Sequence, residues 1–268
     1  MPKYQTPRGP QRIVCLTEEP TEILYALGEG ARIVGISAYT ERPPEAKRDK
    51  PVVSAFVGGS VPKIVALKPD LIIGFSDIQA DLARDLIAAN QPVLIFNQRS
   101  VQEILEVITS LGSLVQCRDK ALDLVAGYTR RIDAVYERSQ TFTTKPRIYF
   151  EEWDDPMICG IEWVSELIEI AGGDDVFRDK ARGKLAKERF VDEASVVAAD
   201  PELMMACWCG KALDAPSVYA RKTMGGISAL AHKQLFELPP EIILQPGPAC
   251  LTDGLDRLVE VIEGFHRS

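Results

Sequence analysis

Histidine is scarce in this sequence, with two in 268 residues, and hydrophobic runs are short. A transmembrane helix needs about 20 consecutive apolar residues, so we expect no membrane insertion. Basic residues are fewer than acidic ones: the chain has 31 Lys and Arg residues and 39 Asp and Glu residues, which gives a formal net charge of −8. Nucleic acids and anionic membranes attract basic surfaces, so this balance argues against both as partners.

Catalytic signatures are missing as well. The sequence contains no Gly-x-x-x-x-Gly-Lys phosphate loop, no His-Glu-x-x-His and no Gly-x-Ser-x-Gly. The adjacent acids Glu151 and Glu152 face opposite sides of a strand, which is a poor arrangement for an acid/base pair. We therefore predict a protein without catalytic residues.

The six cysteines lack the spacing of a disulfide framework, which favours buried thiols in a reducing compartment. Cys207 and Cys209 are close in sequence and would share one face of a strand. Near the N-terminus, the apolar run Ile13–Leu16 is too short for a secretory signal. The sequence as written therefore predicts a cytoplasmic protein, or a periplasmic one if its N-terminus was trimmed.

Short β-rich runs alternate with amphipathic helical patterns along most of the chain, which predicts parallel sheets covered by helices. Strands are expected at residues 12–16, 32–36, 52–56, 71–75, 93–97, 147–153, 203–209 and 234–238. Helices are expected at residues 18–27, 61–67, 79–89, 101–111, 118–140, 163–171, 191–199 and 253–266.

A short internal sequence repeat divides the chain into two similar halves. In Ile64–Ile73 (IVALKPDLII) and in Val196–Met205 (VVAADPELMM), a helix ends, a proline forces a turn, an acid follows and a strand begins. The run from Arg118 to Gln140 lies between the halves and predicts one long helix, packed on one lobe or spanning two. A bilobal protein of this kind binds its ligand in the cleft between lobes.

Four segments carry a family resemblance over almost the whole chain, and they occur in collinear order. They are Arg12–Gly28 (RIVCLTEEPTEILYALG), Val34–Pro44 (VGISAYTERPP), Ile64–Ile73 and Trp163–Gly173 (WVSELIEIAGG). The chain resembles the class III periplasmic binding proteins of ABC importers, and within that class it is most similar to cobalamin-binding proteins. The resemblance implies an α/β fold with two lobes, each a mostly parallel sheet flanked by helices, joined by one long bridging helix.

With this resemblance, the chain divides into four predicted parts: a flexible N-terminal segment (1–11), an N-terminal lobe (12–116), a bridging helix (117–143) and a C-terminal lobe (144–268). The resemblance implies ligand contacts on loops that follow strands. The expected ligand-binding residues are Tyr39, Phe56, Glu152, Trp153, Asp154, Trp208, Cys209 and Gln245. No metal ligands are expected, because the metal receptors of this superfamily need several histidines.

The resemblance implies a non-catalytic small-molecule binder whose ligand is a corrinoid, with no further cofactor. Two alternatives stay open: a binder of a siderophore, tetrapyrrole, other metal chelate or ring-rich metabolite, and a thiol-dependent enzyme that uses Cys209 with Glu152 or Asp154. An ABC permease is the implied partner. However, Pro62 and Ala194 stand where importer-linked members carry docking glutamates.

Overall fold

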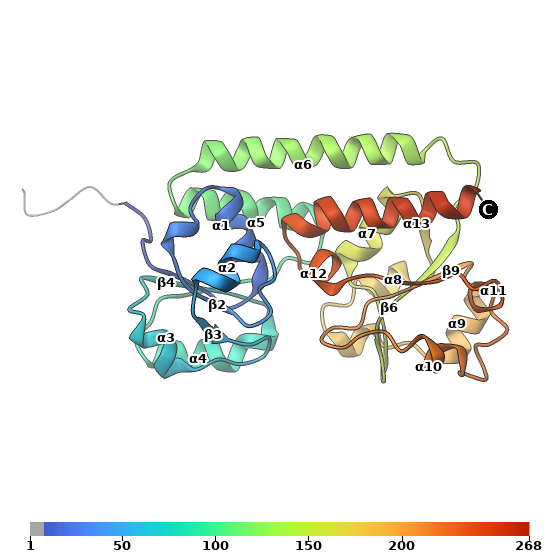
Figure 1. The fold of residues 1–268 in the computed structure, drawn as a ribbon, viewed down its shortest axis with the longest axis horizontal. Helices are drawn as coiled ribbons and strands as arrows, with labels where there is room; N and C mark the ends of the chain where they lie inside the picture. Colours follow the sequence, from blue (N-terminus) through green and yellow to red (C-terminus); the bar gives the residue numbers. More distant parts are fainter. Residues whose placement is uncertain (1–7, 268) are drawn as a thin grey trace, which may run out of the picture. The chain divides into compact units, whose positions relative to one another are not determined.

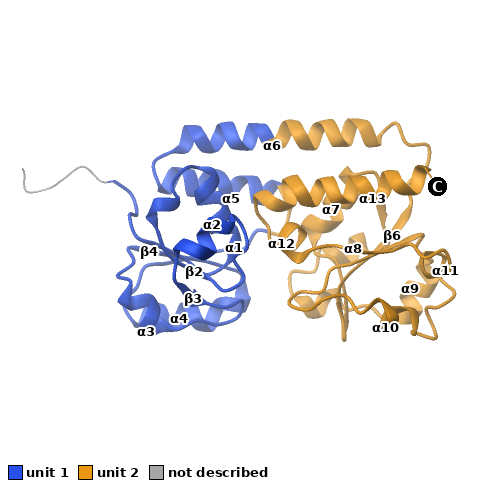
Figure 2. Cartoon of the chain, in the orientation of Figure 1, with its two compact units in different colours: residues 1–98, 102–127 blue, residues 99–101, 128–268 orange. Residues whose placement is uncertain are grey.

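The computed structural model describes residues 8–267, which form two compact units. Unit 1 comprises residues up to Gln98 together with Gln102–Gly127, and unit 2 comprises Arg99–Val101 together with residues from Tyr128 onward (Figure 2). The expected two-lobed α/β fold is therefore confirmed. Of the predicted N-terminal segment, residues 1–7 lie outside the described residues.

Unit 1 contains a five-stranded, fully parallel sheet with the strand order β3-β2-β1-β4-β5 (Figure 1). Its strands are β1 (Ile13–Cys15), β2 (Ile33–Ser37), β3 (Val52–Ser54), β4 (Leu71–Phe75) and β5 (Val93–Phe96). Its α-helices are α1 (Glu18–Ala26), α2 (Pro44–Asp49), α3 (Val61–Ala66), α4 (Ala80–Ala88) and α5 (Val101–Leu114), with 3₁₀ turns η1 (Gly30–Arg32) and η2 (Asp77–Gln79). Apolar side chains such as Val14, Ile64 and Ile72 form the core of this unit.

Unit 2 contains a mixed sheet with the order β10-β9-β6-β7, in which β8 also pairs with β6 and only β7 is antiparallel. Its strands are β6 (Arg147–Asp154), β7 (Met157–Cys159), β8 (Asp174–Asp175), β9 (Leu203–Ala206) and β10 (Leu235–Glu237). Its helices are α7 (Glu162–Ile170), α8 (Arg178–Ala181), η3 (Ala186–Arg189), α9 (Glu193–Ala199), α10 (Ala215–Tyr219), α11 (Ser228–Ala231), α12 (Pro240–Ile243), the π-helical turn η4 (Cys250–Gly254) and α13 (Leu255–Arg267).

The strand orders fix where each sheet can bind a ligand. In unit 1 the chain winds outward from β1 through β2 to β3, and in the other direction through β4 to β5. In unit 2 a similar change of direction separates β6 from β9. Ligands of α/β sheets bind outside the carboxyl ends of the strands at such a switch point. The loops after β1 and β4, and after β6 and β9, are therefore the places to look for a site.

The long helix α6 (Arg118–Ser139) continues from unit 1 into unit 2 (Figure 2). In unit 1 it packs closely on α5 at Gly112, where an added Cβ would lie 2.3 Å from the Cβ of Ala121. In unit 2 its arginines form ion pairs with α13, including Arg138 with Glu263 at 2.5 Å. No helix among residues 8–267 has both the length and the apolar character that crossing a bilayer requires.

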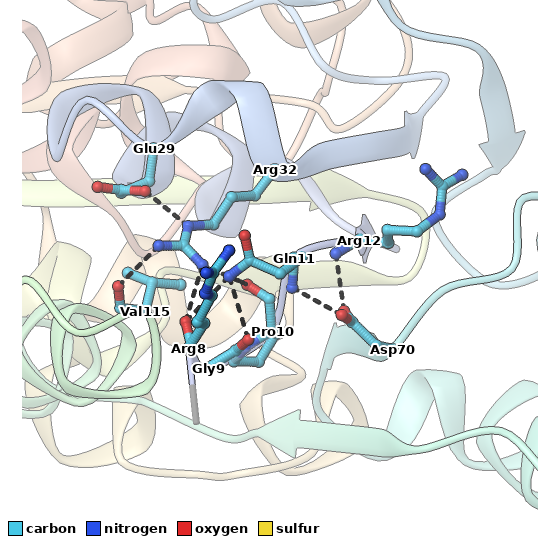
Figure 3. A network of polar contacts seen from close by, with 9 residues as sticks. All are labelled: Arg8, Gly9, Pro10, Gln11, Arg12, Glu29, Arg32, Asp70 and Val115. Atoms are coloured by element: carbon cyan, nitrogen blue, oxygen red, sulfur yellow. Dashed lines mark hydrogen bonds and ion pairs between the residues drawn. The ribbon is translucent and has the colours of Figure 1, made fainter. Parts of the chain in front are cut away.

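The two copies of the internal repeat have the same structural role, which Figure 3 shows for unit 1. The carboxylate of Asp70 accepts hydrogen bonds from the backbone N–H groups of Gln11 (2.7 Å) and Arg12 (2.8 Å), at the start of β1. In unit 2, Glu202 accepts in the same way from the backbone N–H of Arg147 (3.0 Å), at the start of β6. Each acid thus holds the first residues of a neighbouring strand in register.

In each copy of the repeat, the residue before the proline adopts a left-handed backbone conformation, with φ of 49° at Lys68 and 41° at Asp200. This turn exposes carbonyl groups to the arginine at the start of the paired strand, Arg12 in unit 1 and Arg147 in unit 2. Arg12 donates to the carbonyl oxygen of Leu67 (2.5 Å), and Arg147 donates to that of Asp200 (2.9 Å). The residues just before β1 are held as well, because Arg32 donates to the carbonyl oxygen of Pro10 at 2.6 Å (Figure 3).

Several predicted strands are longer than the observed ones, and the difference is largest at β9. The strand expected at residues 203–209 ends at Ala206. The expectation that Cys207 and Cys209 share a strand face is therefore wrong: Cys207 is buried and Cys209 is exposed. Burial raises the pKa of the Cys207 thiol far above its usual range, so this thiol stays protonated.

Candidate ligand-binding site

In unit 1, the predicted site residues Tyr39 and Phe56 lie together at the carboxyl edge of the sheet. Tyr39 follows β2 and Phe56 follows β3. Their rings meet edge to face, with 6.4 Å between centroids and an interplanar angle of 81°. Tyr39 is 46% exposed, so this aromatic pair presents surface to solvent. Such a pair offers a ligand a large apolar contact area together with a phenol hydroxyl.

The buried side chain of Gln79 anchors the loop that carries Phe56. Its Nε2 donates to the carbonyl oxygens of Leu16 and Phe56, both at 3.2 Å, and its Oε1 accepts from the backbone N–H of Phe75 at 3.1 Å. One amide thus connects the ends of β1 and β4 with the loop after β3. The loop has a fixed position because it is tied to the two central strands.

Two further apolar residues at this edge were not predicted. Val57, next to Phe56, is 61% exposed, and Ile78, in the turn after β4, is 37% exposed. Exposed aliphatic side chains on loops that follow parallel strands suggest ligand contact, and their position after strands is the sequence signal that could have found them. We call Tyr39, Phe56, Val57 and Ile78 the unit 1 surface.

Two adjacent carboxylates, Glu18 and Glu19, are buried at the start of α1, directly after β1. Their neighbours are hydroxyl groups: Thr17 donates to Glu19 at 2.9 Å, and Ser37 donates to Glu18 at 3.5 Å. Burial raises the pKa of Glu18, and burial together with the charge of Glu18 raises the pKa of Glu19 to about 8. At neutral pH, Glu19 is therefore protonated to a large extent and can donate a hydrogen bond.

In unit 2, the carboxylate of Glu151 is fully buried at the end of β6 and is saturated with donors. Arg221 binds it through two nitrogens, at 2.6 and 2.9 Å. Trp208 donates its indole N–H at 3.1 Å, and Tyr149 donates its hydroxyl at 3.0 Å. Burial and the adjacent carboxylate raise the pKa of Tyr149 well above its usual value, which keeps this hydroxyl a donor.

Glu152, a predicted ligand residue, points to a different partner. The buried guanidinium of Arg189 binds it through two nitrogens, at 2.5 and 2.9 Å, and also donates to the carbonyl oxygen of Cys159 at 2.8 Å. These bonds fix Glu152 in a structural ion pair at the end of β6. A ligand would have to compete with a bidentate guanidinium for this carboxylate.

The predicted residues Trp153, Asp154 and Trp208 meet around Lys211, which was not predicted. The Lys211 ammonium lies 4.4 Å from the Trp153 ring centre and 4.7 Å from the Trp208 ring centre. It also donates to Asp154 at 2.6 Å. Partial burial acts to raise the pKa of Asp154, but the hydrogen bond and charge of Lys211 outweigh it and lower that pKa. We call Trp153, Asp154, Trp208 and Lys211 the unit 2 surface.

The remaining predicted residues are less closely tied to this surface. Cys209 is exposed in the turn after β9. Gln245 is half-buried beyond α12, where its carbonyl oxygen accepts from the backbone N–H of Gly247 at 2.8 Å. Trp208 is 3% exposed and packs in the core of unit 2, and the Lys211 ammonium lies over its ring. The ligand roles of all these residues stay predictions.

Two α/β units that carry aromatic surfaces at the carboxyl ends of parallel strands define a two-lobed binding protein. The chain belongs to the periplasmic binding protein family, whose model matches residues 13–242. The recognition made from the sequence motifs is therefore confirmed.

Individual relatives agree with this family. The chain is 26% identical to an uncharacterized ABC transporter substrate-binding lipoprotein, YvrC, of Bacillus subtilis (strain 168), over 95% of the chain and 81% of the relative. It is 25% identical to a vitamin B12-binding protein of Vibrio parahaemolyticus, over 96% of the chain and 90% of the relative. The crystal structure of a periplasmic heme-binding protein from Pseudomonas aeruginosa superposes with a TM-score of 0.79 at 18% identity, covering 94% of the chain and 92% of that structure.

These comparisons overturn the predicted location. The cytoplasmic assignment is wrong, because the family is named for the periplasm and one relative is a substrate-binding lipoprotein. A short apolar run near the N-terminus and cysteines without disulfide spacing do not decide the compartment. The Bacillus subtilis relative is named as a substrate-binding component of an ABC transporter.

Proposed function

We propose that this protein is a non-catalytic receptor for a corrinoid, which it binds through the unit 1 and unit 2 surfaces. The observation that carries the proposal is the concentration of aromatic side chains at the carboxyl ends of strands. Tyr39 and Phe56 lie on loops of unit 1, and in unit 2 Trp153 lies near the end of β6 and Trp208 follows β9. Flat rings of this kind provide the large apolar contact that a macrocycle needs.

The charge state of unit 2 supports a ligand with neutral polar side chains. Each cation at the end of β6 is already paired: Arg221 with Glu151, Arg189 with Glu152, and Lys211 with Asp154. A ligand with several negative charges would have to break such pairs, which is costly when the partners are buried. A corrinoid carries amide groups around its ring, and amides both donate and accept hydrogen bonds without net charge.

The direct test is a titration with cyanocobalamin, followed by visible absorbance and by tryptophan fluorescence. We expect saturation near one ligand per chain. Native mass spectrometry of the protein as purified from cells provides a second test that presupposes no ligand. Absence of binding at high micromolar cyanocobalamin would overturn the corrinoid assignment, and a co-purified siderophore or tetrapyrrole would replace it.

The unit 1 surface can be tested with single substitutions. Phe56→Ala and Tyr39→Ala should each weaken corrinoid binding about tenfold, because an aromatic contact contributes about 1–1.5 kcal/mol. Tyr136→Ala is the matched control, since Tyr136 is an equally exposed tyrosine on α6 and lies on no strand-end loop. Equal affinities for all three variants and the wild type would remove unit 1 from the binding site.

Ion pairing also argues against the thiol-dependent enzyme. The carboxylates considered as a base for Cys209 are those of Glu152 and Asp154, and these accept from Arg189 and Lys211. A carboxylate held by a cation is a weak base. We therefore expect no turnover that depends on this thiol, so Cys209→Ala should leave every assayed turnover unchanged.

The permease contact should differ from that of importer-linked relatives that use docking glutamates. Pro62 and Ala194 are both exposed, in the first turns of α3 and α9, and neither carries a charge. Glu193, one position earlier, is half-buried. We propose that recognition by a permease uses other surface groups of this chain.

A further inference from the structure

The turn Trp208–Lys211 brings a lysine back across a tryptophan. Gly210 adopts φ of +82°, a conformation that side chains disfavour, and the backbone N–H of Lys211 points to the carbonyl oxygen of Trp208 at 3.5 Å. The Lys211 ammonium thereby reaches both tryptophan rings and Asp154. These contacts lie on the unit 2 surface, so a ring ligand that stacks there has to displace the ammonium.

Lys211 is the cation at this edge that can move. Arg189 and Arg221 are held by two hydrogen bonds each to carboxylates, and their side chains are 4% and 13% exposed. The Lys211 side chain is 41% exposed and makes a single hydrogen bond to Asp154. A lysine ammonium is a point charge on a flexible stem, so its displacement breaks no bidentate geometry.

Displacement has different consequences for different ligands. An amide at the ring edge can donate its NH₂ group to Asp154 and accept from Lys211 through its carbonyl, so both partners of the broken pair stay satisfied. A carboxylate can accept from Lys211 but cannot donate to Asp154, and it places a second negative charge beside the first. The pair of Asp154 and Lys211 therefore favours the amide.

We propose that Lys211 and Asp154 together determine specificity, selecting ring systems with amide side chains over the same rings with carboxylate side chains. This inference rests on the proposed function, and it names the chemical class of ligand that the unit 2 surface accepts. The two residues act in opposite directions: Lys211 attracts a ligand carboxylate, whereas Asp154 repels it.

A matched ligand pair tests the proposal: dicyanocobinamide, which carries amide side chains, and dicyanocobyrinic acid, which carries carboxylates on the same corrin ring. The measured quantity is the ratio of their dissociation constants. In the wild type we expect tighter binding of the amide ligand. Lys211→Met should increase this preference about three- to tenfold, and Asp154→Asn should decrease it by a similar factor, as removal of one partly exposed charge implies.

Lys145→Met is the matched control, because Lys145 is exposed and precedes the opposite end of β6. This variant should leave the preference unchanged. A second measurement uses the free protein: Lys211→Met should increase quenching of tryptophan fluorescence by acrylamide, since the ammonium no longer covers Trp153. Circular dichroism confirms that the variants are folded.

The outcomes separate this proposal from the proposed function. Failure of the wild type to bind either corrinoid would overturn both. Binding of the amide ligand with a preference that neither Lys211→Met nor Asp154→Asn alters would overturn the specificity proposal alone. Shifts of the two variants in the same direction would also overturn it, because opposite signs are its central expectation.

Discussion

Each unit places two adjacent glutamates near the carboxyl end of its central strand, but the two pairs are stabilised in different ways. In unit 2, Glu151 and Glu152 are each bound by an arginine through two hydrogen bonds. In unit 1, Glu18 and Glu19 have hydroxyl neighbours, Ser37 and Thr17. The same dipeptide therefore gives two ion pairs in one unit and a protonatable pair in the other.

The sizes of two opposing free energies explain why burial favours the protonated form of Glu19 in unit 1. Glu18 and Glu19 lie in the first turn of α1, where the helix dipole stabilises a negative charge by at most about 2 kcal/mol. The rise of the Glu19 pKa from 4.5 to about 8 corresponds to roughly 5 kcal/mol, at about 1.36 kcal/mol per unit. Burial therefore outweighs the dipole. A cation at close range offsets the cost of burial, as Arg221 does for Glu151 in unit 2.

The three tryptophans give an experimental means to separate the units. Trp153, Trp163 and Trp208 all belong to unit 2, so tryptophan fluorescence reports unfolding of that unit alone. Far-UV circular dichroism reports both units. Comparison of the two signals shows which unit a substitution affects.

The largest effect is expected from Glu151→Gln. This change leaves Arg221 without its charged partner and should reduce the free energy of unfolding of unit 2 by about 3–5 kcal/mol. Urea denaturation followed by tryptophan fluorescence measures it. Glu18→Gln is the comparison in unit 1. Followed by far-UV circular dichroism, it should cause no loss of stability, because burial already favours the protonated form of Glu18. Equal losses for the two variants would contradict the comparison between the units.

The second largest effect is expected from the pH dependence of the stability of unit 1. Because the pKa of Glu19 is about 8 in the folded state and near 4.5 when exposed, the folded state binds more protons between these values. The contribution of Glu19 to the stability of unit 1 should therefore be most favourable below about pH 4.5 and fall by at most about 1.4 kcal/mol per pH unit up to pH 8. Glu19→Gln should remove this slope.

Amide hydrogen exchange of the α1 peptide, measured from pH 5 to 8 and corrected for the intrinsic exchange rate, checks the Glu19 prediction. Other charges nearby, including the ion pair of Glu22 with Arg42, are present in both proteins and cancel in the comparison. Parallel profiles for the variant and the wild type would mean that Glu19 is ionised in the folded state.

The smallest expected loss of stability should be equal in the two units. Asp70→Ala and Glu202→Ala each remove a carboxylate that holds the start of a strand, and each should cost about 1–2 kcal/mol. Only Glu202→Ala should change the unfolding midpoint seen by tryptophan fluorescence, whereas both should change the midpoint seen by circular dichroism. A clear difference between the two losses of stability would show that Asp70 and Glu202 are not equivalent.

Much of the fold was predictable because its signals are local. The alternation of apolar strands and helices located β4 at its observed bounds, and it located α6 to within one residue. The segments that sequence reasoning missed are short: β7 and β8 pair with β6, and α2 has six residues. Two- or three-residue strands carry no periodicity, so only their pairing defines them.

The candidate site was predictable only in part. Aromatic residues at or just after strand ends could be named from their positions, as for Tyr39 and Trp153. Lys211 could not, because its partner Asp154 lies 57 positions away and the contact depends on a turn at Gly210. Arg221 was missed for the same reason, since it reaches Glu151 across 70 positions.

The sequence by itself determined the two α/β halves, their shared Pro-acid turn and the family, because these follow from patterns within a few residues. Only the tertiary structure decided which buried carboxylates have a cation as partner. Glu18 and Glu151 are the same residue type in similar places, but within residues 8–267 Glu151 is bound by Arg221 from a distant segment and Glu18 by the hydroxyl of Ser37. Since the cost of burying a charge depends on that partner, the charge pattern of the two surfaces is a property of the folded chain.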